Sequence, residues 1–275
     1  MQTISFLILF LFISGIGTMF GSLLCCYIKR TSRNFAIGLS FSAGIMIYMS
    51  LADLLKKSEQ VFLNIYNQTK TSWLITILFC ISIFLSAILD ALLEKINYSV
   101  ISVNKEITKE QLRRAGLIKV IIFSLISITI HNIPEGLYVF IVSNTDLKMF
   151  YLSALSMILH NILEGIAIAF PIYYIVHSKY KVAIYSFLCG IFEILGLLFI
   201  VLLSHTIINY YIFCFLIIFS SALMLYISFN RVILLARQYG NDRTVFIGVF
   251  VGIVFMMMSS NVIPNIAKIF LSFYQ

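Results

Sequence analysis

The sequence predicts an all-α integral membrane protein with eight transmembrane helices. Hydrophobic residues make up 61% of the 275 residues and charged residues only 11%, whereas an average soluble domain has about 25% charged residues. The mean hydropathy is +1.03. The apolar residues also stand in long continuous runs. Together these features exclude a soluble enzyme and a disordered protein, and the continuous runs argue against a β-barrel, whose strands alternate.

Each helical span needs about 20 mostly apolar residues, and eight runs meet this requirement. In order, they are Ile4–Ile28, Phe35–Leu55, Trp73–Leu93, Leu117–Val142, Met149–Val176, Val182–Leu203, Ile207–Leu235 and Thr244–Phe270. The first run lacks a basic segment before it and a small-residue cleavage site after it, so we keep it as a span rather than a signal peptide. We expect residues 1–275 to form a single transmembrane domain, with residues 94–116 as one inner loop.

The basic residues are distributed unevenly between the predicted connections. Cytoplasmic loops of membrane proteins are enriched in Lys and Arg. If the N-terminus is outside, 14 of the 19 Lys and Arg residues lie inside, and only Lys56, Lys57, Lys70, Lys148 and Lys268 lie outside. We therefore expect a multi-pass protein of the cell membrane with both termini outside. The net charge of +8 then reflects these loops, and we expect no nucleic-acid partner.

Two pairs of spans resemble each other. The segment His131-Asn-Ile-Pro-Glu135-Gly in the fourth span recurs as His160-Asn-Ile-Leu-Glu164-Gly in the fifth. The segment Gly44–Ser50 in the second span recurs more loosely as Ala222–Ser228 in the seventh. In both pairs the two spans cross in opposite directions, which is typical of the inverted repeats of transporters.

Five ionisable residues lie inside the apolar runs at similar depth: His131, Glu135, His160, Glu164 and Glu193. A charge at the centre of a bilayer costs about 3 kcal/mol on insertion scales, so this set needs a common reason. Two interpretations are open, a buried structural polar network and a cation site.

The spacing within the repeated motif favours the cation site. His and Glu four residues apart share one face of a helix, and the Asn after each His widens that face. Neutral imidazole, amide oxygen and carboxylate suit Zn²⁺ and neighbouring divalent metals. Three carboxylates can serve more than one ion. The predicted ligands are His131, Asn132, Glu135, His160, Asn161, Glu164 and Glu193. Pro134 would kink the fourth span beside His131 and free a backbone carbonyl there.

Enzyme and pump functions fit the sequence poorly. No His-Glu-x-x-His motif of a metalloprotease is present, four histidines are few for a membrane di-iron enzyme, and no phosphate-binding Gly-x-x-x-x-Gly-Lys segment occurs. We expect neither catalysis nor a cofactor. A metal-binding membrane sensor without flux is the alternative to a transporter.

The motifs resemble those of the ZIP family of divalent metal transporters, and in particular its bacterial ZupT-type branch. The segment Ile130–Gly136 is similar to the fourth-helix signature of the family, His160–Tyr174 to the fifth and Tyr185–Gly196 to the sixth. Phe41–Leu55 and Ala222–Gly240 are similar to the second and seventh helices. The resemblance covers nearly the whole chain.

This resemblance implies uptake of Zn²⁺, and often Fe²⁺, Mn²⁺, Co²⁺ or Cd²⁺, into the cytoplasm. It implies eight helices in a 3+2+3 inverted-repeat arrangement, commonly in a homodimer, with alternating access by rocking or elevator-like motion. His131, Glu135, His160 and Glu164 match one metal position of the family. The second position is matched by Asn132, Asn161 and Glu193, which share Glu135 and Glu164 with the first.

The chain departs from the family pattern in two places. Leu163 replaces a proline of the fifth-helix signature, and Asn230 and Arg231 replace acidic residues that would line the inner exit. Asp90, near the inner end of the third span, is a candidate exit residue. We also form the hypothesis that Asp90 pairs with Arg231 instead of meeting metal.

Two further residues are candidates for the outer entrance. Ser50 and Asp53 lie near the outer end of the second span, where they could bind an incoming cation before it reaches the ligands. The paired Met46 and Met224 are better explained as packing residues than as ligands.

Overall fold

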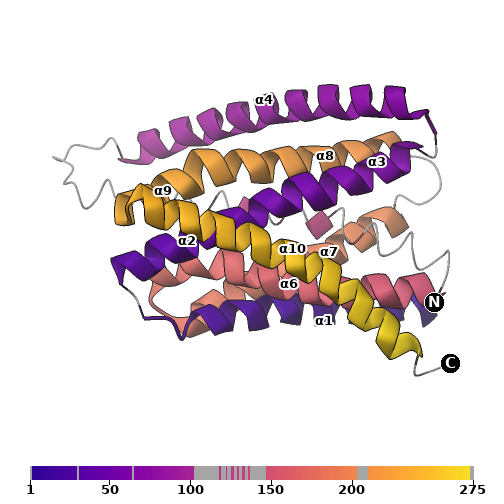
Figure 1. Cartoon of the computed structure of the whole chain (residues 1–275), viewed down its shortest axis with the longest axis horizontal. Helices are drawn as coiled ribbons and strands as arrows, with labels where there is room; N and C mark the ends of the chain where they lie inside the picture. The colour runs from indigo at the N-terminus through magenta and orange to yellow at the C-terminus, as the bar shows by residue number, and fades with distance from the viewer. Residues whose placement is uncertain are drawn as a thin grey trace.

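The computed structural model describes residues 2–29, 31–63, 65–101, 147–202 and 210–272, together with Ile118, Ile122, Leu125, Ile126, Thr129, Asn132, Ile133 and Gly136. All elements in this part of the chain are helical (Figure 1). Most of the predicted fourth span and of the predicted inner loop lies outside the described residues.

Helices occupy the positions of the other seven predicted spans. They are α1 (Gln2–Cys25), α2 (Ser32–Tyr48) continued by η1 (Met49–Leu54) and α3 (Leu55–Leu63), α4 (Gln68–Ile101), α6 (Leu147–Val176), α7 (Lys179–Leu202), α8 (Tyr210–Ile227) continued by η2 (Ser228–Ile233) and α9 (Leu234–Tyr239), and α10 (Asp242–Ser272). The elements η1 and η2 are π-helical segments.

Short polar residues begin several of these helices. The backbone N–H of Asn34 donates to the hydroxyl of Thr31 at the start of α2, over 3.1 Å. The side-chain oxygens of Asn67 and Asn241 accept equivalent bonds at the starts of α4 and α10. Such caps satisfy backbone donors that have no partner within the helix. Helix α6 ends before His177, whose φ of 55° is left-handed.

Several helices extend beyond the predicted apolar runs. The inner loop was expected to begin at residue 94, but α4 continues to Ile101. Likewise, α3 carries the second span on to Leu63 through Lys56 and Lys57. Hydropathy marks where a helix leaves the membrane, whereas the backbone hydrogen bonds continue into polar residues with good helix propensity.

The described helices form two packed groups. Helix α1 packs against α6 and α7 in the first group, while α2 packs against α10 and α4 packs against α8 in the second. The groups meet where α2 and α10 contact α6. In Figure 1, α4 lies along one side of the bundle and α1 along the opposite side.

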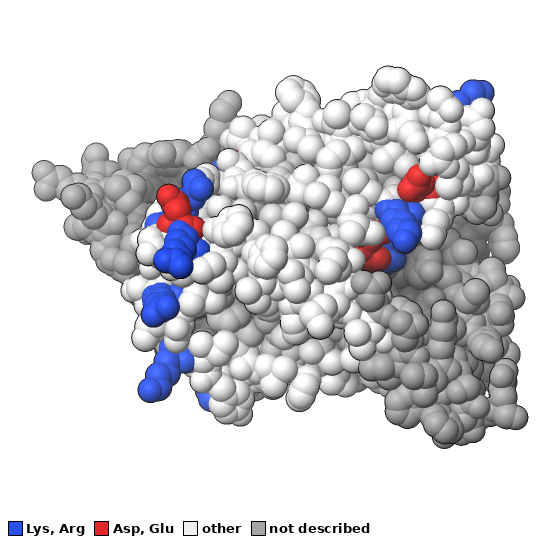
Figure 2. Space-filling view, viewed as in Figure 1, with Lys and Arg blue, Asp and Glu red and all other residues white. Residues whose placement is uncertain are grey.

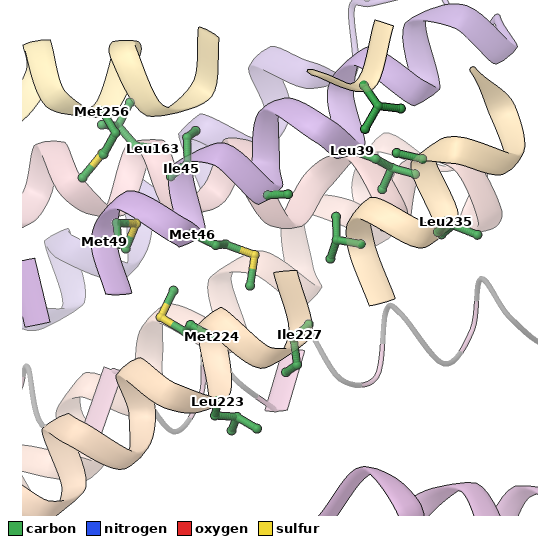
Figure 3. Packing of buried hydrophobic residues seen from close by; sticks show 14 of the residues in the cluster. Leu39, Ile45, Met46, Met49, Leu163, Leu223, Met224, Ile227, Leu235 and Met256 are labelled. Carbon is green, nitrogen blue, oxygen red and sulfur yellow. The ribbon is translucent and has the colours of Figure 1, made fainter. Parts of the chain in front are cut away.

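A large apolar cluster joins α2 to α8 within the second group. Met46 and Met49 of α2 and η1 lie beside Met224 and Ile227 of α8, and Leu163 of α6 reaches the same cluster (Figure 3). The packing role expected for Met46 and Met224 is in keeping with their burial in this cluster.

The outer surface matches a bilayer. Within the described residues, five helical segments are long and apolar enough to span a membrane. In the space-filling view the charged side chains lie toward the two ends of the visible face, and a broad band between them is uncharged (Figure 2). The chain is thus a multi-pass membrane protein. Helix α1 begins and α10 ends at the same end of the bundle (Figure 1).

The connections at the opposite end lie close together. The ammonium of Lys179, the first residue of α7, lies 4.1 Å from the ring centroid of Tyr27, between α1 and α2. The rings of Phe35 at the start of α2 and Tyr239 at the end of α9 are 4.8 Å apart. Six basic residues lie in these connections or in the helix turns that flank them: Lys29, Arg33, Lys179, Lys181, Arg237 and Arg243.

The two π-helical segments fall at matching places in the looser internal similarity. One begins at Met49, the residue before the last of Gly44–Ser50, and the other begins at Ser228, the last residue of Ala222–Ser228, so the two starts differ by one residue. Ser50 lies at a contact between α8 and η1, where its hydroxyl donates to the backbone oxygen of Ser221 over 2.7 Å and the Ser221 hydroxyl donates back to the Ser50 oxygen over 2.9 Å. The two similar stretches of the second and seventh spans therefore share a π-helical distortion as well as sequence.

The contact between α1 and α6 depends on glycine. A β-carbon added at Gly165 would overlap the carbonyl oxygen of Thr18, and one added at Gly21 would overlap that of Ile162. Without side chains at these points the two backbones can touch, as is common between membrane helices.

Substitutions at these glycines should rank by the space available. We expect Gly165→Ala to destabilise the protein by about 2 kcal/mol, because overpacking a close contact costs about 1–3 kcal/mol. Gly15→Ala is the matched control, since its β-carbon would meet the Gly190 carbonyl carbon at 3.3 Å, and should cost less. Thermal unfolding in detergent measures both. Equal effects at the two positions would contradict this packing.

Candidate metal site

Three predicted ligands lie on one stretch of α6. His160 and Glu164 are one turn apart, with 3.6 Å between His160 Nε2 and Glu164 Oε1. Their exposed fractions are 8% and 1%, and Asn161 between them is fully buried. The motif's spacing thus places an imidazole, an amide and a carboxylate together inside the bundle.

Helix α7 adds Glu193 to this group. The Asn161 side-chain amide donates a hydrogen bond to Glu193 Oε1, and Glu193 is fully buried. Asn161 Nδ2 also lies 2.6 Å from the hydroxyl oxygen of Ser14 on α1. The amide of Asn161 therefore connects three helices at the depth of the two carboxylates.

Asn132 is held in a similar way. Its side-chain amide donates to the backbone oxygen of Cys189 over 2.9 Å, one turn before Glu193 on α7. In both Asn132 and Asn161 the amide nitrogen is used in this way, while the buried amide oxygen has no hydrogen-bond partner within the part of the chain that the structure describes. An amide oxygen is a metal ligand, so both residues are oriented in a way that suits a cation.

The charge of the group also suits a divalent cation. Glu164 and Glu193 place two carboxylates among apolar helices, and burial strongly penalises such charges unless they are compensated. A divalent cation carries the two positive charges that match them. The donor set of imidazole nitrogen and carboxylate and amide oxygens fits Zn²⁺ and its first-row neighbours.

Two of the seven predicted ligands, His131 and Glu135, lie outside the described residues, as does Pro134. Among the residues that the structure describes, no three His, Cys, Asp or Glu side chains gather closely enough to form a metal site by themselves. The described ligands His160, Asn161, Glu164 and Glu193 form a contiguous group, and Asn132 joins α7 at Cys189.

Sequence reasoning missed Ser14. Its signal was available in the first span, where Ser14, Thr18 and Ser22 recur every four residues and are all fully buried. A hydroxyl stripe on one face of an apolar helix indicates a polar neighbour, although such residues also bond to their own helix backbone.

Comparison with known proteins identifies the family. No family model matches the chain. The zinc transporter ZupT of Streptococcus mutans is 33% identical over 250 residues, which cover 90% of this chain and 93% of the relative. That of Nitratidesulfovibrio vulgaris is 32% identical over 261 residues, with 90% and 92% covered. That of Chlorobium limicola is 34% identical over 251 residues, with 90% and 94% covered. The chain belongs to the ZIP family of metal transporters, in its ZupT-type branch.

In the ZIP family, acidic residues stand at the positions that Asn230 and Arg231 occupy in this chain. In the structure, both residues contact Asp90. Arg231 Nη2 lies 2.6 Å from one carboxylate oxygen of Asp90 and 2.7 Å from the other. Asn230 and Tyr226 donate further bonds to Asp90. The hypothesis that Asp90 pairs with Arg231 is confirmed. The pair joins α4 to η2 in this ZIP-family chain and occupies both oxygens of Asp90.

The two entrance candidates have different surroundings. Ser50 is fully buried and bonds to Ser221. Asp53 is partly exposed and forms an ion pair with Lys57, one turn further along, with 3.0 Å between Lys57 Nζ and Asp53 Oδ2. Of the two candidates, Asp53 is thus the more exposed, and its carboxylate is paired with Lys57.

Exchanging the charges of the buried pair tests its role. Asp90→Arg or Arg231→Asp alone places two like charges together and should cost about 3 kcal/mol or more, because a buried charge is left uncompensated. The double exchange should recover part of this loss, as measured by thermal unfolding.

The control is the exposed pair Arg237–Asp242, with 3.1 Å between Arg237 Nε and Asp242 Oδ1. The same exchange there should cost less than about 1 kcal/mol. A double variant at Asp90 and Arg231 that is no more stable than its singles would contradict the assigned interaction.

Proposed function

We propose that the protein moves divalent metal cations, chiefly Zn²⁺, into the cytoplasm. Fe²⁺, Mn²⁺, Co²⁺ and Cd²⁺ are further candidate cargoes, since these ligands discriminate poorly and affinity follows the Irving–Williams order. The observation that carries the proposal is the buried group of Asn161, Glu164 and Glu193 inside a bundle of apolar helices. The relatives named as zinc transporters support the choice of zinc.

The proposed site uses all seven predicted ligands. His131 and Glu135 join His160 and Glu164 around one cation, and the three remaining residues hold a second position with the two shared glutamates. The oriented amides of Asn132 and Asn161 support this assignment. Since the imidazoles and carboxylates must be deprotonated to bind metal, protonation would favour release. Zinc is cargo here, and the proposal needs no cofactor and no catalytic step.

The proposed architecture is one domain over residues 1–275, with eight spans in a 3+2+3 inverted repeat. The packing of α4 on α8 and of α10 on α2 supports it, because an inverted repeat relates the third span to the eighth and the second to the seventh. The matched π-helical segments give further support. We place the basic connections in the cytoplasm, both termini outside, and the protein in the cell membrane as a homodimer.

Alternating access follows from this arrangement. A hydrated cation is attracted by Asp53, loses water to the His, Asn and Glu ligands, and is then exposed to the inside. Helices α6 and α7, which carry the described ligands, pack with α1 in one group. The other group contacts this one mainly through α2 and α10. A relative motion of the two groups would carry the ligands without breaking their mutual contacts. Asp90 would bind the leaving cation at the exit only if its ion pair with Arg231 opened.

Uptake of ⁶⁵Zn into proteoliposomes tests this function. We expect saturable uptake by the wild type and a loss of at least about tenfold in Glu164→Gln, because changes to second-shell residues alone cost about 10–100-fold. Glu59→Gln is the control, since Glu59 bonds to exposed Gln68 outside the site. Competition by Mn²⁺, Fe²⁺ and Cd²⁺ would rank the cargoes.

Two other results of the uptake experiment would contradict parts of the proposal. Zinc binding without uptake would overturn transport in favour of a membrane sensor. Equal uptake by the wild type and Glu164→Gln would remove Glu164 from the path.

A further inference from the structure

Helix α1 presents buried hydroxyls to the proposed metal site. Ser14, Thr18 and Ser22 are spaced by four residues and are all fully buried, and α1 packs directly on α6 and α7. The Ser22 hydroxyl donates to the Met19 carbonyl of its own helix over 2.7 Å. Ser14 instead contacts a predicted ligand on another helix.

Ser14 and Glu193 together hold the side-chain amide of Asn161. A side-chain amide carries two N–H hydrogens, and Asn161 Nδ2 has two acceptors, Ser14 Oγ at 2.6 Å and Glu193 Oε1. Both hydrogens are thus used. Rotating the amide by half a turn would direct its oxygen at the Glu193 carboxylate, which has no hydrogen to donate when ionised. Glu193 therefore selects which way the amide faces, and the Ser14 hydroxyl, which can accept or donate, holds the amide in that place. The amide oxygen is therefore directed away from both residues.

The surroundings of Ser14 hold it in this position. Its neighbour Gly15 meets the backbone of Gly190 on α7, and Thr18, one turn later, meets Gly165 beside Glu164. These backbone contacts leave α1 little freedom to slide or rotate against α6 and α7. A rigid supporting contact of this kind is what keeps a ligand in binding geometry.

We propose that Ser14 is a positioning residue of the metal site. By accepting one amide hydrogen of Asn161, it holds this side chain in the orientation that Glu193 selects, with the amide oxygen toward the cation. The first helix is then part of the site although it contributes no predicted ligand. This inference rests on the proposed function, because it needs Asn161 to bind metal.

Zinc titration of the purified protein by calorimetry tests the inference. Removing a supporting partner of a metal ligand typically weakens binding about 10–100-fold. We expect Ser14→Ala to weaken zinc binding by at least about tenfold and Ser22→Ala, the matched control on the same helix face, to leave it unchanged. If Ser14 only stabilised the fold, the effect of Ser14→Ala on zinc binding would not depend on the presence of Asn161. In an Asn161→Ala background, Ser14→Ala should therefore cause no further loss.

The other possible results of these titrations also decide the role of Ser14. Binding by Ser14→Ala within about twofold of the wild type, while Asn161→Ala binds weakly, would overturn the role of Ser14 but not the proposed function. Losses that multiply in the double variant would also overturn it. No zinc binding by the wild type would overturn both. If Ser14→Ala shows no thermal unfolding transition, Ser14→Thr decides, since it keeps the oxygen. Wild-type affinity then supports the proposal, and a tenfold loss overturns it.

Discussion

The burial of two carboxylates inside an apolar helix bundle is the constraint on which the rest of the structure depends. Glu164 and Glu193 are shielded from water by helices whose own surfaces suit lipid. Each such charge costs about 3 kcal/mol at the centre of a bilayer on insertion scales. A charge of this kind needs compensation, and in the proposed function a divalent cation supplies it. In the same proposal, the surrounding amides and hydroxyls hold the ligands in place.

Close backbone packing makes the site possible. Because Gly21 and Gly165 lack side chains, α1 approaches α6 closely enough for Ser14 to reach Asn161. Gly190 gives α7 the same access to α1. Elsewhere in the bundle, polar groups serve a different purpose, since Asp90 and Arg231 neutralise each other and join two helices. The Asp90–Arg231 pair thus serves to join helices, whereas Glu164 and Glu193 belong to the group that we propose binds a cation.

Much of the arrangement could be predicted from the sequence, and the exceptions have physical reasons. The seven spans that coincide with described helices were predictable because hydropathy reports burial in lipid, and the shared face of His160 and Glu164 follows from helix geometry. The helix ends could not be predicted from hydropathy, because α4 continues to Ile101 after its apolar run has ended. The partner of Asp90 was predictable because Arg231 stands within an apolar run, where a charge needs an opposite charge beside it. Ser14 was not, because a serine in an apolar helix usually bonds to its own backbone, and only the packing of α1 on α6 distinguishes it from Ser22.

Anomalous diffraction at the zinc edge from crystals grown with Zn²⁺ tests the central claim most directly. The account predicts a zinc peak between α6 and α7, with oxygens of Glu164 and Glu193 at about 2.0–2.2 Å and the amide oxygen of Asn161 facing the metal. A peak only at Asp53 or Asp90, or a zinc ion that leaves Glu164 and Glu193 uncoordinated, would contradict it.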